Sequence, residues 1–372
     1  IMKKINFAKL NIIKDDLKTV NKVLMSGWLA HGEYSEKFEK EICKFTKSKY
    51  AVTVSSCTAG LHLTFLSMNL KLGDEVIVTA MTHTATAHSV EYTGAKAVFC
   101  DINYKTGNIC PKDFEKKITS KTKAVAIVHM AGLAVELDAI MKICKRKNIK
   151  IVEDCAHSLG TIYKNKHVGL FGICGVFSFY PTKQITTGEG GVVISNNKNF
   201  IEKIKKLKAF GIDTPPQLRK KPGVYDIKYL GFNYRMTEFQ AVLGLTQLKR
   251  YAHNLKKRRY NAQYLTKLIQ PLKNVHSIDY DKNNSYFIFQ VLFENTKLRD
   301  KAIKILQESN IGFSIHYATP VPLFSFYKKK YGYEKEQFPH SFNYSRNSLS
   351  LPINNNISKS DLNIIYNKLK LI

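Results

Sequence analysis

The stretch that decides the fold reads Gly175-Val-Phe-Ser-Phe-Tyr180, then Pro181-Thr-Lys-Gln-Ile-Thr-Thr-Gly-Glu-Gly-Gly191, then Val192-Val-Ile-Ser195. The first and third pieces are apolar runs of strand length, and the glycine-rich middle piece favours a turn. Lys183 therefore lies in a turn between two predicted strands, close to Ser178, rather than on a solvated helix face.

A second predicted strand, 149–152, ends in Glu153-Asp-Cys-Ala-His157. In open α/β sheets, ligands collect at the carboxyl ends of the strands, so Asp154, Ser178 and Lys183 are expected at one edge. An amine, a hydroxyl and a carboxylate match a cofactor that carries an aldehyde, a phosphate and a pyridine nitrogen. The combination indicates pyridoxal phosphate.

Two earlier strand ends offer further ligand groups. Ser55-Ser-Cys-Thr58 follows a predicted strand and opens a helix, so Thr58 and the amides of Thr58 and Ala59 can hold a phosphate through hydrogen bonds and the helix dipole. A plain threonine N-cap is the alternative interpretation. His83 follows another strand, where its flat ring could cover one face of a cofactor ring.

Short apolar strands alternate with helices through the first half of the chain. We expect helices at 11–26, 35–48, 59–66, 85–92 and 137–147, and strands at 51–54, 75–78, 97–100, 124–128 and 149–152. This alternation predicts an α/β fold with a mainly parallel sheet covered on both faces.

The character of the chain changes after residue 210. A loop containing several prolines is expected at 211–231, followed by a long helix at 237–270 with Thr237 as its N-cap. An antiparallel strand at 285–292 and helices at 298–308 and 359–370 complete the pattern. A chain of 372 residues favours two domains, and we place them at 1–245 and 246–372, with the boundary inside the long helix.

The chain is strongly basic, with 58 lysines and arginines against 29 acidic residues and a net charge of +29. Such a balance can indicate a nucleic-acid-binding protein, which stays the alternative from a different class. The basic residues are nevertheless spread along the whole chain, and the densest clusters, at 203–208, 219–221 and 256–259, lie away from the cofactor-like motifs. We expect these clusters on solvated faces and no nucleic-acid partner.

Seven cysteines without a CxxC pair favour unpaired thiols in a reducing cytoplasm over a disulfide framework or a metal site. No window approaches the roughly 20 apolar residues that cross a bilayer. The first residues lack the apolar region of a signal peptide. A cytoplasmic protein with no bound metal and no membrane contact is expected.

Six motifs, in this order, resemble the DegT-type (DegT/DnrJ/StrS) sugar-nucleotide aminotransferases, which belong to the fold type I pyridoxal-phosphate enzymes. They are Ser26-Gly-Trp28, Ser55-Ser-Cys-Thr-Ala59, Glu153-Asp-Cys-Ala-His157, Phe177–Gly191, Gly231-Phe-Asn-Tyr-Arg-Met-Thr237 and His316-Tyr317. The resemblance runs from about residue 8 to the C-terminus. It implies a large domain with a mostly parallel seven-stranded sheet between helices and a smaller C-terminal α+β domain.

The resemblance also implies roles for the residues. Lys183 would bond covalently to the cofactor and then move a proton, while Asp154 would pair with the pyridinium nitrogen. Asn233 would reach the phosphate from a second subunit, which implies a homodimer with shared active sites. The other cofactor contacts would be Thr58, Ala59 and Ser178 to the phosphate, His83 stacked on the ring and His157 at the ring hydroxyl.

The same resemblance implies a reaction. Relatives that dehydrate a sugar carry histidine where this chain has Lys183, so amino transfer is expected and dehydration is a distant alternative. L-glutamate would be the donor and a keto-sugar nucleotide the acceptor, in surface polysaccharide or glycan biosynthesis. The 184–191 variant favours C4 of a 4-keto-6-deoxy sugar over C3 amination. Substrate contacts would come from His316, Tyr317 and Arg346, although Arg346 could instead pair with a surface carboxylate.

Overall fold

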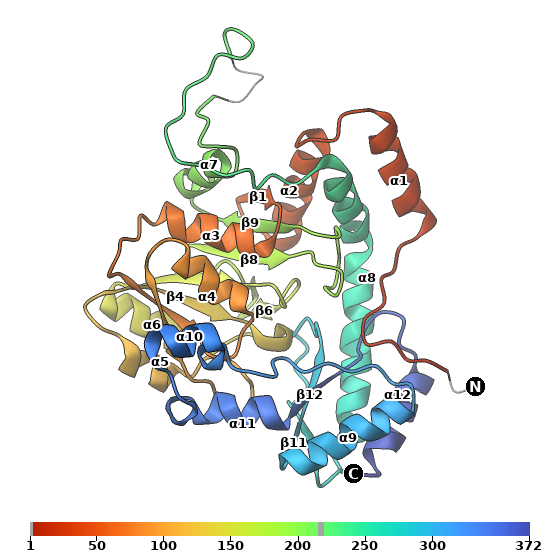
Figure 1. The fold of residues 1–372 in the computed structure, drawn as a ribbon. Coiled ribbons are helices and arrows are strands. Elements are labelled where there is room, and N and C mark those ends of the chain that lie inside the picture. The colour runs from red at the N-terminus through yellow and green to blue at the C-terminus, as the bar shows by residue number, and fades with distance from the viewer. Residues whose placement is uncertain (1–2, 215–218) are drawn as a thin grey trace.

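The computed structural model describes residues 3–214 and 219–372 and is built around a seven-stranded sheet (Figure 1). The strand order is β1-β9-β8-β5-β4-β2-β3. Only β9 runs antiparallel to its neighbours, so the expected mostly parallel sheet is confirmed. The strands are β1 Tyr50–Val54, β2 Glu75–Thr79, β3 Lys96–Cys100, β4 Thr122–Val128, β5 Lys150–Asp154, β8 Cys174–Ser178 and β9 Gly191–Ser195.

Helices cover both faces of this sheet, because successive strand residues point to opposite sides. On β2, for example, Ile77 joins one core, whereas Val76 and Val78 join the other. The first core is closed by α2 (Glu33–Thr46), α5 (Pro111–Lys117), α6 (Leu137–Lys147) and the first half of α8 (Glu238–Ile269). The second is closed by α3 (Cys57–Ser67), α4 (Thr84–Glu91), α7 (Lys198–Leu207) and α10 (Ser325–Tyr331).

The long helix α8 connects the sheet to the C-terminal part of the chain (Figure 1). Leu245 and Leu248 belong to the core of the large sheet, while Ala262 and Leu265 belong to a third core. The domain boundary inside this helix stays a prediction. Around the third core lie the antiparallel strands β10 (Val275–Ser277), β11 (Phe289–Phe293) and β12 (Ser348–Leu351), with helices α9 (Thr296–Glu308) and α12 (Lys359–Leu369).

Several shorter or peripheral elements complete the chain. Helix α1 (Lys14–Met25) packs on α8, and α11 (Pro339–Asn347) packs on α9. A small hairpin joins β6 (Ile162–Tyr163) to β7 (Lys166–His167).

The strand predicted at 285–292 is wrong over its first half. Strand β11 begins only at Phe289, because Tyr286 takes a left-handed backbone conformation with a φ of 47°. The carbonyl groups of Tyr286 and Phe287 accept hydrogen bonds from the Arg258 guanidinium instead of a neighbouring strand. The alternating apolar pattern therefore continues through a turn that approaches the large sheet.

The expectation that the basic clusters are solvated is also wrong in part. Lys208 is 4% exposed and its ammonium donates to the carbonyl oxygen of Thr53 at 2.8 Å. Arg258 is likewise buried, among main-chain carbonyl groups. Carbonyl oxygens replace water around these cations, and the Glu39 carboxylate, 3.6 Å from the Lys208 ammonium, adds a countercharge. Of the predicted loop at 211–231, residues 215–218, including Pro215 and Pro216, lie outside the described residues.

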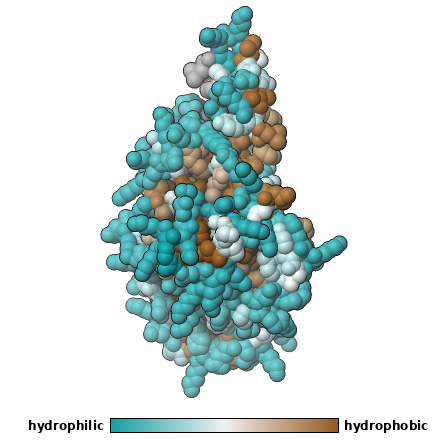
Figure 2. Space-filling view, turned by 90° about the vertical axis from the view of Figure 1, so that its left-hand side faces the viewer, coloured by the Kyte–Doolittle hydropathy of each residue, from teal (hydrophilic) through white to brown (hydrophobic). Residues whose placement is uncertain are grey.

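The surface is largely hydrophilic, except where apolar side chains gather along a projecting segment (Figure 2). This segment, which includes residues 219–230, projects from the body of the protein next to α7 (Figure 1). Its side chains include Leu230, which is 89% exposed, and Val224, which is 63% exposed. Among the helices in the described ranges, none combines the length and the hydropathy of a membrane span.

Candidate active site

Lys183 lies in a compact loop that connects β8 to β9. Its amide donates to the carbonyl oxygen of Tyr180 at 2.9 Å, which closes the first turn of the loop. The Thr186 hydroxyl donates to the carbonyl oxygen of Phe179 at 2.9 Å and accepts the amide of Gly188 at 3.0 Å. Gly188 has a φ of 81°, a conformation that favours glycine. The loop thereby fixes the backbone from which the lysine side chain extends.

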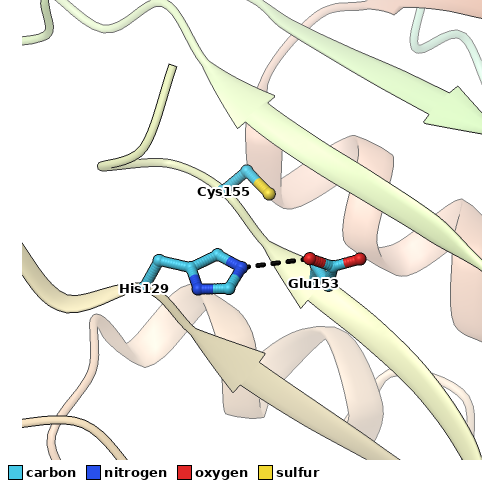
Figure 3. A group of neighbouring side chains, drawn as sticks. All are labelled: His129, Glu153 and Cys155. Carbon is cyan, nitrogen blue, oxygen red and sulfur yellow. Dashed lines mark hydrogen bonds and ion pairs between the residues drawn. The ribbon is translucent and has the colours of Figure 1, made fainter. Parts of the chain in front are cut away.

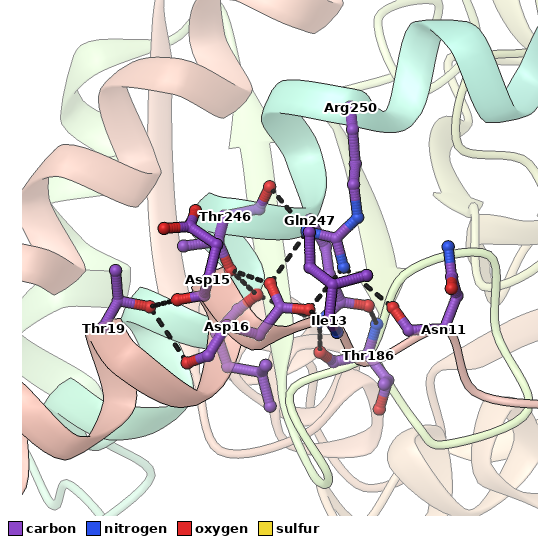
Figure 4. Close-up of polar contacts among 10 residues, drawn as sticks. Asn11, Ile13, Asp15, Asp16, Thr19, Thr186, Thr246, Gln247 and Arg250 are labelled. Carbon is purple, nitrogen blue, oxygen red and sulfur yellow. Dashed lines mark hydrogen bonds and ion pairs between the residues drawn. The ribbon is translucent and has the colours of Figure 1, made fainter.

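Helix α8 lies beside this loop and forms hydrogen bonds with it (Figure 4). The Gln247 amide accepts the N–H of Thr186 at 3.1 Å and donates to its carbonyl oxygen at 2.5 Å. One residue earlier, Thr246 donates to the buried carboxylate of Asp16 at 2.6 Å, and Arg250 forms an ion pair with the same carboxylate at 2.5 Å. One face of α8 thus fixes both the Lys183 loop and the start of α1.

Asp154 ends β5 and is 4% exposed. Its Oδ2 accepts the Thr86 hydroxyl at 2.8 Å, and its Oδ1 accepts the amide of Ala156 at 3.0 Å. In the sheet, Asp154 pairs with Val176, two residues before Ser178. The carboxylate and the Lys183 loop therefore meet at the same edge of the sheet, as the sequence predicts.

The Lys183 amine is held in a half-buried environment. Burial lowers the pKa of Lys183 to about 8, although the Cys57 thiol and the Asp154 carboxylate act in the opposite direction. Both the ammonium and the neutral amine are therefore accessible near neutral pH. Such a lysine can serve as a nucleophile and as a proton carrier.

Aromatic side chains surround the amine. The buried His157 ring stacks on Phe287 with 4.4 Å between centroids, and its Nε2 lies 3.2 Å from the Tyr317 hydroxyl. The exposed His83 ring meets Tyr317 edge-on at 6.2 Å and caps α4 by accepting the amide of Ala85. His157 and Tyr317, which the sequence assigned to different ligands, are thus direct neighbours.

The histidines of the site are uncharged at neutral pH. Burial, reinforced by the nearby Lys183 ammonium, lowers the pKa of His316 to about 3 and that of His157 well below its ordinary value. The same two causes lower the pKa of His83. His316 is further tied by a 2.9 Å hydrogen bond between its Nδ1 and the Ser350 hydroxyl. Neutral imidazoles can accept or donate a hydrogen bond without competing with the ammonium for an anion.

The expected phosphate site lies at the start of α3. Ser56, rather than Thr58, is the N-cap residue, and its hydroxyl already accepts the amide of Ala59 at 3.0 Å. This edge lies directly against the end of the Lys183 loop, since a Cβ added to Gly191 would come within 2.7 Å of the amide nitrogen of Cys57. Within residues 3–214 and 219–372 the Thr58 hydroxyl has no hydrogen bond, so it and the helix N-terminus remain suited to an anion.

Two predicted site residues lie outside this cluster. Asn233 is exposed, pairs through its backbone with Ala209 and accepts the Arg235 guanidinium at 3.0 Å. Arg346 is exposed on α11, beside a hollow of about 310 Å³ that also includes Lys328. Within residues 3–214 and 219–372, Arg346 forms no ion pair with a carboxylate.

With this geometry established, comparison with known proteins identifies the chain. The model of the DegT/DnrJ/EryC1/StrS aminotransferase family matches residues 10–370. The chain belongs to this family. It is 35% identical to the spore coat polysaccharide biosynthesis protein SpsC of Bacillus subtilis, over 94% of this chain and 92% of that protein. It is 33% identical to the UDP-4-amino-4,6-dideoxy-N-acetyl-beta-L-altrosamine transaminase of Campylobacter jejuni, over 98% of this chain and 96% of that protein.

Solved structures agree with this assignment. The pyridoxal-phosphate form of the putative sugar aminotransferase Spr1654 from Streptococcus pneumoniae superposes with a TM-score of 0.92 at 26% identity, covering 99% of this chain and 98% of that one. The DegT/DnrJ/EryC1/StrS chain described here is therefore a fold type I aminotransferase, and the predicted cofactor, pyridoxal phosphate, is confirmed.

The residues present fit this cofactor. The His157 Nδ1 is buried and has no hydrogen-bond partner among the described residues, so it can receive a polar group of a ligand. Asp154 offers a carboxylate to a protonated ring nitrogen, and Lys183 offers the amine. A buried polar atom without a partner is unfavourable unless a ligand or water supplies one.

A second group of buried side chains, His129, Glu153 and Cys155, lies around the end of β5 (Figure 3). Glu153 is fully buried next to Asp154, and His129 approaches its carboxylate at 3.1 Å. The Nδ1 of His129 accepts the amide of Val135 at 3.2 Å, so its Nε2 carries the proton and donates to Glu153. Cys155 lies beside this pair. The arrangement anchors the strand end that carries Asp154.

Several residues of the site escaped the sequence prediction. Thr86 lies one turn after His83 on α4, a spacing that could have indicated a second contact from the same helix end. Phe287 lay within a predicted strand and showed no signal of its own. Gln247 lay inside a long helix, where nothing in the local pattern distinguishes a residue that binds a distant loop.

Proposed function

We propose that this enzyme transfers an amino group from L-glutamate to a keto-sugar nucleotide, at C4 of a 4-keto-6-deoxy sugar, for surface polysaccharide or glycan biosynthesis. One observation carries the proposal: the half-buried Lys183 amine lies close to the buried Asp154 carboxylate, at the ends of neighbouring strands. The chain that brings these two groups together belongs to this family. The name of the Campylobacter relative, a transaminase of a 4-amino-4,6-dideoxy sugar nucleotide, supports the C4 position. That of SpsC supports polysaccharide biosynthesis.

When bound, pyridoxal phosphate supplies a ring that withdraws electrons from the reacting carbon. Asp154 would keep the ring nitrogen protonated through charge pairing. Its two oxygens are oriented by Thr86 and by the amide of Ala156, so the carboxylate cannot rotate away. Thr58, Ala59 and Ser178 would hold the phosphate at the start of α3 and the end of β8.

Lys183 would hold the cofactor through its amine, and as a free amine it would carry the proton to and from the reacting carbon. A pKa of about 8 suits both tasks, because a general acid and base works best when its pKa lies near the working pH. His83 would cover one face of the cofactor ring. His157 would donate to or accept from its hydroxyl group through the unpaired Nδ1.

His316, Tyr317 and Arg346 would bind the sugar nucleotide. Tyr317 is followed directly by Ala318 and Thr319, which line the hollow beside Arg346. Lys328 and Lys335 lie at the same hollow but face Glu334 at 2.9 Å and Glu336 at 3.9 Å, so among the described residues Arg346 is the cation at this hollow that is left for a diphosphate. We therefore place the sugar near Tyr317 and the diphosphate toward Arg346.

The proposed enzyme is a homodimer in which the partner's Asn233 completes the phosphate site. Asn233 is exposed and lies outside the cluster of its own subunit, as such a role requires. The surface also carries large exposed apolar side chains that a second subunit could cover, since exposed apolar surface is typical of interfaces. They include Leu230, at 89%, together with Met25, at 80%, and Trp28, at 62%.

A substrate screen tests the proposal. Purified enzyme loaded with pyridoxal phosphate is incubated with L-glutamate and GDP-, UDP- or dTDP-linked 4-keto-6-deoxy sugars. Release of 2-oxoglutarate and the mass and NMR spectrum of the product are then measured. We expect one nucleotide to give a 4-amino product with wild-type enzyme and none with Lys183→Ala. A product aminated at C3, or turnover by Lys183→Ala, would refute the corresponding part of the proposal.

A further inference from the structure

An aromatic ring from the C-terminal part of the chain lies against the Lys183 amine. The Nζ atom is 4.2 Å from the centroid of the Phe287 ring, over its face. Within residues 3–214 and 219–372, this amine has no hydrogen bond and no ion pair. Its defined contact is therefore the ring rather than a carboxylate or a carbonyl group.

The Phe287 ring is fixed in place by its own backbone. Phe287 is 5% exposed, its amide donates to the carbonyl oxygen of Ala131 at 3.2 Å, and its carbonyl oxygen accepts Nη1 of Arg258 at 3.3 Å. Arg258 is itself buried and also binds the carbonyl oxygen of Tyr286 at 3.1 Å. A ring held from two sides and stacked on His157 has little freedom to turn away from the amine.

The loop of Lys183 is tied to the same segment. The Gln184 side chain donates to the carbonyl oxygen of His157 at 2.9 Å and to the Ser285 hydroxyl at 3.2 Å. Ser285 donates in turn to the carbonyl oxygen of His157 at 3.1 Å. Side-chain hydrogen bonds thus join the residue after Lys183 to the segment that carries Phe287. They keep the distance between the amine and the ring fixed.

Few charged groups surround the Lys183 amine, so the aromatic ring can contribute to holding it. Asp154 on β5 and Cys57 on α3 face Lys183, as do the imidazoles of His83, His157 and His316. The imidazoles are neutral at neutral pH, so Asp154 is the countercharge that these elements supply. An aromatic face attracts an ammonium group, and the attraction grows where water is excluded.

We infer that Phe287 is a positioning residue for Lys183, and that its ring holds the amine at the site whenever the amine is not bonded to the cofactor. The inference rests on the proposed role of Lys183. A lysine side chain has many rotamers, and a released amine without a partner would swing toward solvent. Held over the ring, it stays beside Asp154 and His157 and can return its proton to the same substrate carbon.

The test measures the amine in cofactor-free protein. Phe287→Leu keeps an apolar side chain of similar size but removes the aromatic face. Reductive methylation of Lys183 is followed by peptide mass spectrometry between pH 6 and pH 10, since only the neutral amine reacts. Without the ring the amine swings toward solvent and loses the burial that lowers its pKa, so the pKa rises toward the ordinary value of a lysine. At pH 7 we therefore expect roughly threefold to tenfold slower labelling in Phe287→Leu than in wild type.

Two variants serve as controls. Phe287→Tyr keeps an aromatic face and should reproduce the wild-type curve. Phe289→Leu makes the same change two residues along, in the C-terminal core and away from Lys183, and should also leave the curve unchanged. Phe287→Met replaces Phe287→Leu if the latter does not fold.

Either of two outcomes overturns the inference: superimposable curves for wild type and the variant without the ring, or an equal shift in Phe289→Leu. Neither outcome would contradict the proposed function. That function fails instead if borohydride does not attach the cofactor to Lys183 in wild-type enzyme.

Discussion

Glu153→Gln offers a sharp test of how the strand end bearing Asp154 is supported. The buried carboxylate accepts four hydrogen bonds (Figure 3 shows the one from His129). Oε1 accepts the amides of Phe171 at 2.6 Å and Gly172 at 2.8 Å. Oε2 accepts the amide of Gly169 at 2.6 Å and Nε2 of His129 at 3.1 Å. Each oxygen thus faces two donors.

Glutamine has the same shape but carries only one oxygen. Whichever way the amide turns, its NH₂ group faces two donors and two charge-assisted hydrogen bonds are lost. Each such bond contributes about 1.5–3 kcal/mol, and neighbouring losses are not additive, so we expect Glu153→Gln to lower the free energy of unfolding by roughly 3–5 kcal/mol.

Urea unfolding followed by circular dichroism measures this change. Glu136→Gln is the matched control, because Glu136 is exposed and, although it is the N-cap residue of α6, its side chain makes no capping hydrogen bond to that helix. It should change the free energy of unfolding by less than about 0.5 kcal/mol. If Glu153→Gln falls within about 1 kcal/mol of wild type, the four-bond description of this carboxylate is wrong.

Three further predictions follow from the same structure. The rate of cofactor attachment to the apoenzyme, measured by stopped-flow absorbance, should rise about tenfold per pH unit up to pH 8 and then level off, because burial lowers the pKa of Lys183 to about 8. A plateau reached only above about pH 10 would contradict this. Asp154→Asn should bind cofactor weakly and slow the release of 2-oxoglutarate by at least about 100-fold, as single-turnover kinetics would measure, whereas wild-type rates would remove its assigned role. Burial alone would raise the pKa of Asp16, but the Arg250 and Thr246 hydrogen bonds hold it below its ordinary value. Asp16→Asn should therefore cost about 2–4 kcal/mol in urea unfolding at pH 7, and this difference should be constant above about pH 5 and shrink as the pH falls below about 4; a difference that grows at low pH would refute the ion pair.

Much of the candidate site could be predicted because its residues lie at strand ends. In a parallel sheet, the residue that follows each strand reaches the same edge, whatever the distance along the chain. Local patterns therefore sufficed to bring Asp154, Ser178 and Lys183 together. The sheet itself could be predicted for the same reason, since each buried strand shows as a short apolar run.

The contacts that the sequence missed are those made between distant segments. Arg258 lies in a dense basic cluster, and nothing in its neighbours indicates that it binds the carbonyl groups of Tyr286 and Phe287. The alternation around Phe287 has the period of a strand, but the left-handed Tyr286 interrupts the strand there. Period-2 patterns report which side chains are buried, not which backbone groups pair.

The Lys183 loop shows why these distant contacts matter for interpreting the chemistry. Its backbone is fixed by Thr186 within the loop, by Gln247 on α8 and by Gln184 toward Ser285, and none of these contacts uses the lysine amine. Removing the amine in Lys183→Ala therefore leaves every restraint on the loop in place. A loss of activity in that variant would report the missing nucleophile and proton carrier rather than a collapsed site. Gln247→Leu makes the opposite change, because it keeps the amine but frees the loop.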